Sequence, residues 1–271
     1  MIRGTRNRWI QAASNIALIA AFLFALSFLP PDNSLAEIRR TGVIKLCVPR
    51  HFPPLAQNDP QEPGFDVELV RMIAEDIGVR MTVNVMTSMG QDFNPRNWRL
   101  TRGQCNIIAG GVADTIQTRN FLQTIPTGVE TGWVAISRTE APPSRGSVWA
   151  IWPGASGLDR ISLSTWVREQ GITPRLMRSP DELQRLLDNG EVDGAIVERF
   201  VASSADLSRG YSMFWLAPER FQHYQMALGL WKGDQTLYRA VERSLRKIKG
   251  SNNFRSINVQ YGLDRTIALP P

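Results

Sequence analysis

The chain has 271 residues, of which 43% are apolar and 21% are charged, and its formal net charge is +6. This length is ample for one large domain or two lobes, and the apolar content excludes both a disordered chain and a multi-span membrane protein. Two cysteines exclude a disulfide-rich scaffold, two histidines leave little for a metal centre, and the scattered basic residues do not form the stripe of a nucleic-acid binder. We therefore expect no metal, no cofactor and no nucleic-acid partner.

The first 36 residues have the composition of an export signal. Three arginines precede an apolar stretch at 16–29, and the small residues Ser34 and Ala36 follow it. This order predicts a secretory signal at 1–36, cleaved after Ala36. An apolar helix of this length rises roughly 21 Å, short of the ~30 Å hydrocarbon core, so a retained anchor is the weaker alternative. We expect the rest of the chain to be a soluble periplasmic monomer.

The next segment alternates strand and helix patterns. A β-rich run at 43–48 predicts a strand, and the three-to-four spacing of apolar side chains over 65–77, ended by Gly78, predicts a helix. Alternation over 80–86 and the short apolar run at 106–109 predict two more strands. This order is typical of a parallel α/β unit.

The middle of the chain repeats this theme. The apolar run at 148–152 predicts a strand, and a helix is expected to begin at Leu158. The Ser-Pro-Asp-Glu segment at 179–182 has the features of a helix start, and the helix it predicts stops at Gly190. A further strand is expected at 192–197.

The last part returns to the first α/β unit. A strand is expected from His223 to Leu230, and Asp234 is expected to cap a long amphipathic helix. Its apolar face consists of Leu237, Val241, Leu245 and Ile248.

The chain therefore predicts two α/β lobes joined by two crossing segments. We place the first lobe at 37–132 and 223–271, and the second at 133–222. Ligands bind in clefts at such lobe interfaces, beside the carboxyl ends of the parallel strands.

Catalytic motifs are not found in the sequence. The two histidines have no metal-like spacing, and Gly154-Ala155-Ser156-Gly157-Leu158 departs from the Gly-x-Ser-x-Gly of serine hydrolases at its last position. Phosphate-binding and dinucleotide-binding glycine motifs are absent from the sequence. We therefore expect a binding protein rather than an enzyme.

Four groups of short segments carry a family resemblance. They are 42–46 with 52–55 and 64–69, then 103–108, then 189–195, and then 231–234. In this order and spacing they resemble the family-3 extracytoplasmic solute-binding proteins, the polar-amino-acid receptors of ABC importers, over about residues 38–262. The resemblance implies the type II periplasmic binding protein fold, in which each lobe has a mostly parallel sheet flanked by helices. It also implies a small polar solute and a membrane permease as partners.

The resemblance also implies ligand-binding residues in the first lobe. Phe52 falls where the family has an aromatic ring on the apolar part of the ligand, and a core phenylalanine is the alternative. Gly110, Gly111 and Ala113 fall in the loop that binds the ligand carboxylate. Arg119 falls near the family's arginine, whose planar fork binds that carboxylate. A surface arginine is the alternative, because one extra residue separates Arg119 from Gly111.

In the second lobe, Trp152 and Ser156 fall in a loop before a helix N-terminus that can receive an anion. Glu198 falls where the family has an aspartate that pairs with the ligand ammonium. A core tryptophan and a solvated carboxylate are the respective alternatives. We expect Arg119 and Glu198 to face each other across one cleft.

The two cysteines admit two interpretations. In an oxidising compartment Cys47 and Cys105 can pair, but buried free thiols are also common. Their segments are similar to those of receptor-like proteins associated with periplasmic quinoprotein alcohol dehydrogenases, and this similarity favours a disulfide.

Three functions remain open from the sequence. The leading one is a periplasmic receptor that captures an amino-acid-like solute for an ABC importer. The second is an accessory protein that docks onto a periplasmic quinoprotein dehydrogenase. The third is a periplasmic dehydratase with Glu198 as general acid. The glycines and alanine that replace hydroxyl-bearing residues in the binding loops weaken the match to an ordinary amino-acid site.

Overall fold

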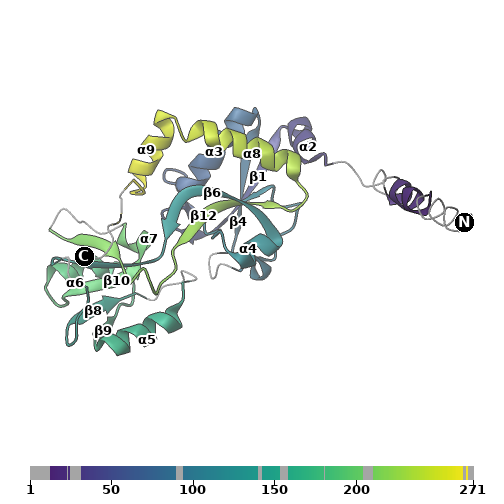
Figure 1. Cartoon of the computed structure of the whole chain (residues 1–271). Coiled ribbons are helices and arrows are strands. Elements are labelled where there is room, and N and C mark those ends of the chain that lie inside the picture. The colour runs from purple at the N-terminus through teal and green to yellow at the C-terminus, as the bar shows by residue number, and fades with distance from the viewer. Residues whose placement is uncertain are drawn as a thin grey trace, which may run out of the picture. The chain divides into compact units, whose positions relative to one another are not determined.

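The computed structural model describes residues 13–22, 24, 32–89, 94–139, 142–152, 158–179, 181–203, 210–264 and 267. The chain divides into two compact units, residues 1–33 and 34–271. In the first unit, residues 13–22 are helical and their side chains are exposed (Figure 1). Among the described residues, no helix has the length and apolar character needed to cross a membrane.

The first lobe of the second unit is built on a five-stranded sheet. Its strands are β1 (Val43–Pro49), β4 (Arg80–Met86), β5 (Ile107–Ile108), β6 (Leu122–Thr131) and β12 (Tyr224–Trp231), in the order β4-β1-β5-β12-β6. β1 runs parallel to β4 and β5, whereas β12 runs antiparallel to β5 and β6. Figure 1 shows β6 and β12 side by side, although 92 residues separate their ends in the sequence, from 132 to 223.

Helices and short elements complete this lobe. The predicted helix over 65–77 is α3 (Phe65–Ile77), which ends at Gly78 in the left-handed conformation. The predicted C-terminal helix is α8 (Gln235–Ile248), whose four predicted apolar residues are all buried. The other elements are α2 (Ser34–Thr41), β2 (His51–Phe52), β3 (Ala56–Gln57), the 3-10 helix η1 (Pro95–Trp98), α4 (Ile116–Phe121) and α9 (Asn252–Gln260).

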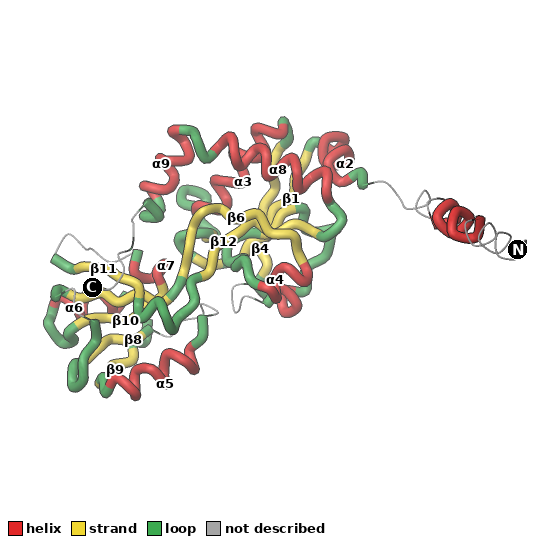
Figure 2. Tube along the Cα trace, in the orientation of Figure 1, coloured by secondary structure: helices red, strands yellow, loops and turns green. Residues whose placement is uncertain are grey.

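The second lobe has a sheet of its own. Its strands are β7 (Trp133–Ser137), β8 (Val148–Ile151), β9 (Thr173–Leu176), β10 (Gly194–Glu198) and β11 (Ser212–Trp215), in the order β11-β7-β10-β8-β9. β8 runs parallel to β9 and β10, and β7 runs antiparallel to β10 and β11. Figure 2 shows these strands with the helices around them.

Three helices belong to the second lobe: α5 (Arg160–Gln170), α6 (Glu182–Asp188) and α7 (Arg199–Ala202). α5 begins two residues later than expected, because the Asp159 carboxylate accepts hydrogen bonds from the first-turn amides. α6 also begins late. The residue that occupies its N-cap position is Asp181.

Both sheets are mostly parallel, as the sequence predicted, since four of the five strands in each run in the same direction and one is reversed. In each sheet two of the four strand pairings are antiparallel. The reversed strand is β12 in the first sheet and β7 in the second. Both lie next to the crossings between the lobes, where β6 leads into β7 and β11 leads back to β12. The sequence patterns missed β6, β7 and β11. The first sheet takes its strands from 43–131 and 224–231, and the second from 133–215.

A disulfide joins Cys47 on β1 to Cys105 just before β5, with a Cα–Cα distance of 5.4 Å. Both residues are fully buried. The pairing favoured by the sequence similarity is therefore confirmed, and the free-thiol alternative is wrong.

The outer strands of the first sheet explain a second difference. The alternation over 80–86 is typical of a half-buried strand, but Val83 and Val85 on the apolar positions of β4 are 41% and 40% exposed, because β4 has a neighbour on one side only. β6 is the other edge strand. It contains Pro126, whose carbonyl oxygen accepts a hydrogen bond from Lys249.

Candidate functional site

Phe52 lies at the contact between the two lobes. Its ring packs edge-on against Phe200 of α7, with centroids 6.1 Å apart, and both side chains are buried. The ring also lies close to Gly111, where an added Cβ would be 3.6 Å from it. The predicted ligand-facing ring is therefore covered by protein atoms in this arrangement.

The glycine loop after β5 is held by a buried acid. Gly110 and Gly111 both have positive φ, and the Gly110 amide donates a 2.8 Å hydrogen bond to Asp66 of α3. Asp66 is 1% exposed, and burial raises the pKa of its carboxyl to about 7 despite this hydrogen bond. Ala113, also buried, pairs with Met226 on β12. The Gly110 amide, which was expected to bind a carboxylate of the ligand, thus binds one from the protein.

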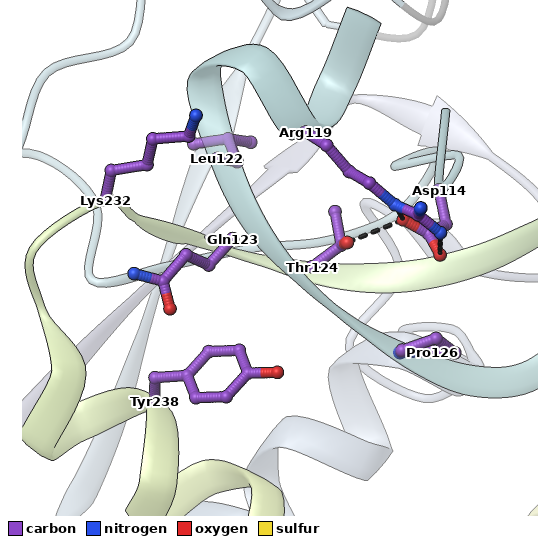
Figure 3. Close-up of a pocket in the computed structure, with 8 residues that line it drawn as sticks. All are labelled: Asp114, Arg119, Leu122, Gln123, Thr124, Pro126, Lys232 and Tyr238. Carbon is purple, nitrogen blue, oxygen red and sulfur yellow. Dashed lines mark hydrogen bonds and ion pairs between the residues drawn. The ribbon is translucent and has the colours of Figure 1, made fainter. Parts of the chain in front are cut away.

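Arg119 on α4 is paired within its own lobe (Figure 3). Its guanidinium donates hydrogen bonds of 2.7 and 2.6 Å to the two oxygens of Asp114. Thr124 donates another to Asp114, and these contacts, chiefly that of Arg119, hold the pKa of the Asp114 carboxyl below its usual value. The Arg119 side chain is 62% exposed.

Glu198 lies at the end of β10 and is 6% exposed. Its Oε1 accepts a 2.9 Å hydrogen bond from Thr131 at the end of β6. Burial raises the pKa of Glu198 to about 8, so this carboxyl is largely protonated at neutral pH. Arg119 and Glu198 were expected to face each other, but their hydrogen bonds go to different partners, Asp114 and Thr131.

Arg199, next to Glu198, was not predicted to have a role. It is 7% exposed and donates hydrogen bonds to the carbonyl oxygens of Glu130 on β6 and Leu263 after α9. It thereby ties the second lobe to a crossing strand and to the C-terminal segment. The signal for it in the sequence is weak, because an arginine after a strand is usually exposed.

The remaining predicted residues lie in the second-lobe loop. Trp152 is half-buried and packs against the apolar core of the second lobe. Ser156 lies outside the described residues.

A cavity of about 210 Å³ lies at the start of α5. Its volume is below the ~300–1,000 Å³ typical of drug-sized ligand sites, so it suits a small solute. Its walls come from the first residues of β7 and α5 and from the segment that leads into β12. The lining residues are Trp133, Leu158, Asp159, Ser162, Arg220, Phe221, Gln222 and Tyr224.

Two features of this cavity point to a polar ligand. Trp133 is 2% exposed, and its indole N–H has no hydrogen-bond acceptor among the described residues. A buried donor without an acceptor costs about 1–3 kcal/mol, which a ligand oxygen would recover. Asp159 and Arg220 add one charge of each sign, and Arg220 forms an ion pair of 2.7 Å with Glu169.

Asp159 stays ionised in this cavity. It accepts hydrogen bonds from the amides of Ile161 and Ser162, and from the Ser162 hydroxyl. These bonds, chiefly those from Ser162, lower the pKa of the Asp159 carboxyl. Asp159 was not predicted to have a role, although an aspartate before an amphipathic segment is a recognisable helix-cap signal.

Comparison with known proteins identifies the family. The family model for bacterial extracellular solute-binding proteins, family 3, matches residues 44–264, about four-fifths of the chain. The chain belongs to this family of solute-binding proteins. The family resemblance noted in the sequence is thus confirmed.

Solved structures confirm the two-lobe type II fold of this family-3 protein. A polar amino acid ABC uptake transporter substrate-binding protein from Streptococcus thermophilus is similar with a TM-score of 0.68 and 16% identity, over 85% of this chain and 89% of the other. An ancestral amino-acid-binding protein, described as a precursor of cyclohexadienyl dehydratase, gives a TM-score of 0.53 and 16% identity, over 84% and 99% of the two chains.

A curated relative is an enzyme. Membrane-bound lytic murein transglycosylase F from Marinobacter nauticus is 25% identical over 133 residues, which are 49% of this chain. The match spans about a quarter of the length of that relative. Enzymes therefore occur among the relatives of this solute-binding protein.

Proposed function

We propose that this family-3 protein is exported to the periplasm, where it captures a small zwitterionic, amino-acid-like solute and delivers it to the permease of an ABC importer. The observation that carries the proposal is the cavity at the start of α5, which combines a buried unpaired donor with charges of both signs. A zwitterion carries the complementary groups within a volume that this cavity can hold.

Each end of the solute has a partner in the cavity. The ionised Asp159 receives the ammonium group, because its carboxylate is the acid that lines this cavity. The Trp133 indole and the N–H groups of Arg220 donate to the carboxylate. The rings of Phe221 and Tyr224 supply apolar surface beside them.

The first-lobe residues act when the lobes move. Phe52, packed on Phe200, represents a closed arrangement, and opening of the lobes would expose this ring together with the glycine loop. Gly111, Ala113 and the second-lobe residues Trp152 and Ser156 remain proposed contacts for a solute in an open form.

Calorimetric titration with the common amino acids and dicarboxylates tests the proposal. We expect one or more amino acids to bind, and Asp159→Asn to weaken this binding at least tenfold, because the ammonium loses its counter-charge. Trp133→Phe removes one hydrogen bond and should weaken binding about fivefold. Asp181→Asn is a matched control, since Asp181 also occupies a helix N-cap position in the second lobe but does not line the cavity. Binding of no amino acid would contradict the proposal, as would equal effects of Asp159→Asn and Asp181→Asn.

The disulfide favours one second candidate, a protein that docks onto a periplasmic quinoprotein dehydrogenase. The cysteine pair that carries this similarity is bonded. Co-purification from the periplasm distinguishes the two functions: a dehydrogenase partner supports docking, and importer components alone contradict it.

A catalytic role has weaker support. Glu198 is protonated at neutral pH and could donate a proton, but Thr131 is the hydrogen-bond partner that the structure gives it, and it does not line the cavity at α5. We expect no turnover of prephenate-like substrates, measured by absorbance, and turnover would reverse this assignment.

A further inference from the structure

A second cavity lies entirely within the first lobe. It has a volume of about 440 Å³, within the range of small-molecule sites. Figure 3 shows its walls, which come from α4, the first half of the edge strand β6, the turn after β12 and the start of α8. The lining residues are Asp114, Arg119, Leu122, Gln123, Thr124, Pro126, Lys232 and Tyr238.

The charges in this cavity do not cancel. Asp114 is compensated by Arg119 through two short hydrogen bonds. Lys232 is the second cation of the lining, and its ammonium has no partner among the described residues. The cavity therefore carries one uncompensated positive charge.

Hydrogen-bond donors also outnumber acceptors here. An ammonium offers three N–H donors, and a guanidinium has five, of which Arg119 uses two for Asp114. The Gln123 amide and the Tyr238 hydroxyl add further donors, and neither group has a partner among the described residues. A negatively charged group that only accepts hydrogen bonds, such as a carboxylate or a phosphate, would pair with these donors.

We infer that this cavity is a second binding site, separate from the solute cavity at α5, and that it takes a small organic anion with a carboxylate or phosphate group. The anionic group binds the ammonium of Lys232, and the guanidinium of Arg119, on the opposite side of the cavity in Figure 3, offers its outward N–H groups to a second acceptor of the molecule. Leu122, Pro126 and the Tyr238 ring receive the apolar part of the molecule. This inference goes beyond the proposed function, because the cavity at α5 offers both charges and suits a zwitterion, whereas this one offers a surplus of positive charge.

Titration with succinate and with inorganic phosphate, each at millimolar concentration and at ionic strength balanced with chloride, tests the inference. We expect at least one of the two to bind, and Lys232→Met to weaken it at least tenfold. The two probes separate a carboxylate site from a phosphate site.

Two control variants make the result specific. Lys247→Met removes a lysine that pairs with Asp76 outside the cavity, and it should leave anion binding unchanged. Asp159→Asn should also leave it unchanged, which separates this site from the solute cavity. The inference is wrong if neither probe binds, or if Lys232→Met and Lys247→Met have equal effects.

An independent observation concerns the start of the folded unit. Ser34 Oγ accepts a 3.3 Å hydrogen bond from the Leu237 amide in the first turn of α8, and it lies 3.0 Å from the Thr236 hydroxyl. The Leu35 amide donates to the same hydroxyl. Asp234, at the N-cap position of α8, makes no side-chain cap hydrogen bond, so Ser34 supplies a cap from another helix.

We infer that Ser34, Leu35 and Ala36 belong to the mature protein, and that removal of the export signal takes place on the N-terminal side of Ser34. The sequence-based cleavage after Ala36 would cut inside α2, discard the cap of α8 and remove Leu35, which packs on the core. This inference rests on the proposed export of the protein.

N-terminal sequencing and intact mass of the protein from the periplasm test it. A chain that begins at or before Ser34 supports the inference, and one that begins at Glu37 overturns it. An uncleaved chain contradicts the export part of the proposed function instead. In that case the melting temperatures of two variants test whether Ser34 caps α8 and so belongs to the folded unit. Ser34→Ala, in a chain that starts at Asp32, should melt about 2–4 °C lower, whereas Ser256→Ala on the exposed face of α9 should not. Equal melting of the two variants would show that Ser34 does not cap α8.

Discussion

The two lobes have the same sheet pattern. The first sheet reads β4-β1-β5-β12-β6 and the second, in the matching direction, β9-β8-β10-β7-β11. In both, two parallel pairings are followed by two antiparallel ones. The loops that the sequence predicted to bind the ligand therefore follow corresponding strands, β1 and β5 in one lobe and β8 and β10 in the other.

The residues at those ends differ. After β5 the first lobe has Gly110 and Gly111, and its buried acid, Asp66, comes from a helix. At the end of β10 the second lobe has its own buried acid, Glu198, followed by Arg199. The two lobes thus share a strand order but have different polar side chains at the corresponding strand ends, because the strand order does not determine these side chains.

The largest difference between the lobes is expected from the disulfide, which only the first lobe has. Replacing both Cys47 and Cys105 with alanine should lower the free energy of unfolding by about 4 kcal/mol, because the bridge closes a loop of 58 residues. Denaturant unfolding measures the loss, and hydrogen exchange should place it in β1 and β5 rather than in β8 and β10. A loss below about 1 kcal/mol would mean that packing alone holds the first lobe.

Two glycines make the next comparison. Gly110→Ala should cost about 2–3 kcal/mol more than Gly190→Ala. Both glycines have positive φ. A Cβ added at Gly110 would lie 2.6 Å from the Ala56 Cβ, whereas a Cβ added at Gly190 would have no neighbouring atom within 4 Å. Urea unfolding of both variants checks this. Equal costs would show that the loop after β5 moves aside freely.

The two buried acids should respond differently to pH. The folded-state pKa of Glu198 is about 8 and that of Asp66 about 7, both above their ordinary values, so the folded protein holds these protons more tightly than the unfolded chain. The contribution of these two acids to stability should therefore be greatest at low pH, below their ordinary pKa values, and fall as pH rises towards 8. Between pH 6 and 8 the loss is about 2 kcal/mol from Glu198 and about 1 kcal/mol from Asp66.

Amide variants separate the two contributions. Glu198→Gln should flatten the dependence of the free energy of unfolding on pH more than Asp66→Asn does, because the amides do not titrate. Urea unfolding at pH 6, 7 and 8 measures both slopes. If neither variant changes the slope, the two acids are ionised in the folded protein.

The smallest effect is expected where the lobes touch. The edge-on pair of Phe52 and Phe200 should show a coupling of about 1 kcal/mol in a double-mutant cycle with leucine at each position. Urea unfolding of the four proteins gives this value. A coupling near zero would mean that the two rings are apart in solution.

Much of the fold could be predicted because its signals are local. The spacing of apolar residues and the glycine stop at Gly78 predicted α3, and the face of Leu237 and Val241 predicted α8. The crossing strands were harder, since β6 contains Pro126 and Gly128, which interrupt a strand pattern, and its partner β12 lies 92 residues further on.

The site was predicted less well, because charge pairing depends on contacts that sequence spacing does not give. Arg119 was identified by its likeness to a family position, but Asp114, only five residues earlier, binds it. Glu198 has the carboxyl group of the family residue, yet burial keeps it largely protonated and therefore uncharged at neutral pH. Trp133 carried no signal, because an unpaired indole N–H can be recognised only once its surroundings are known.

The edge strand β6 has one further consequence. An edge strand exposes unpaired amides and carbonyls, to which a strand of another molecule can add. In β6, Pro126 lacks an amide hydrogen, and Lys249 covers its carbonyl with a charged, strongly hydrated group. This combination hinders the addition of another molecule's strand at the middle of β6, and so opposes aggregation at high protein concentration.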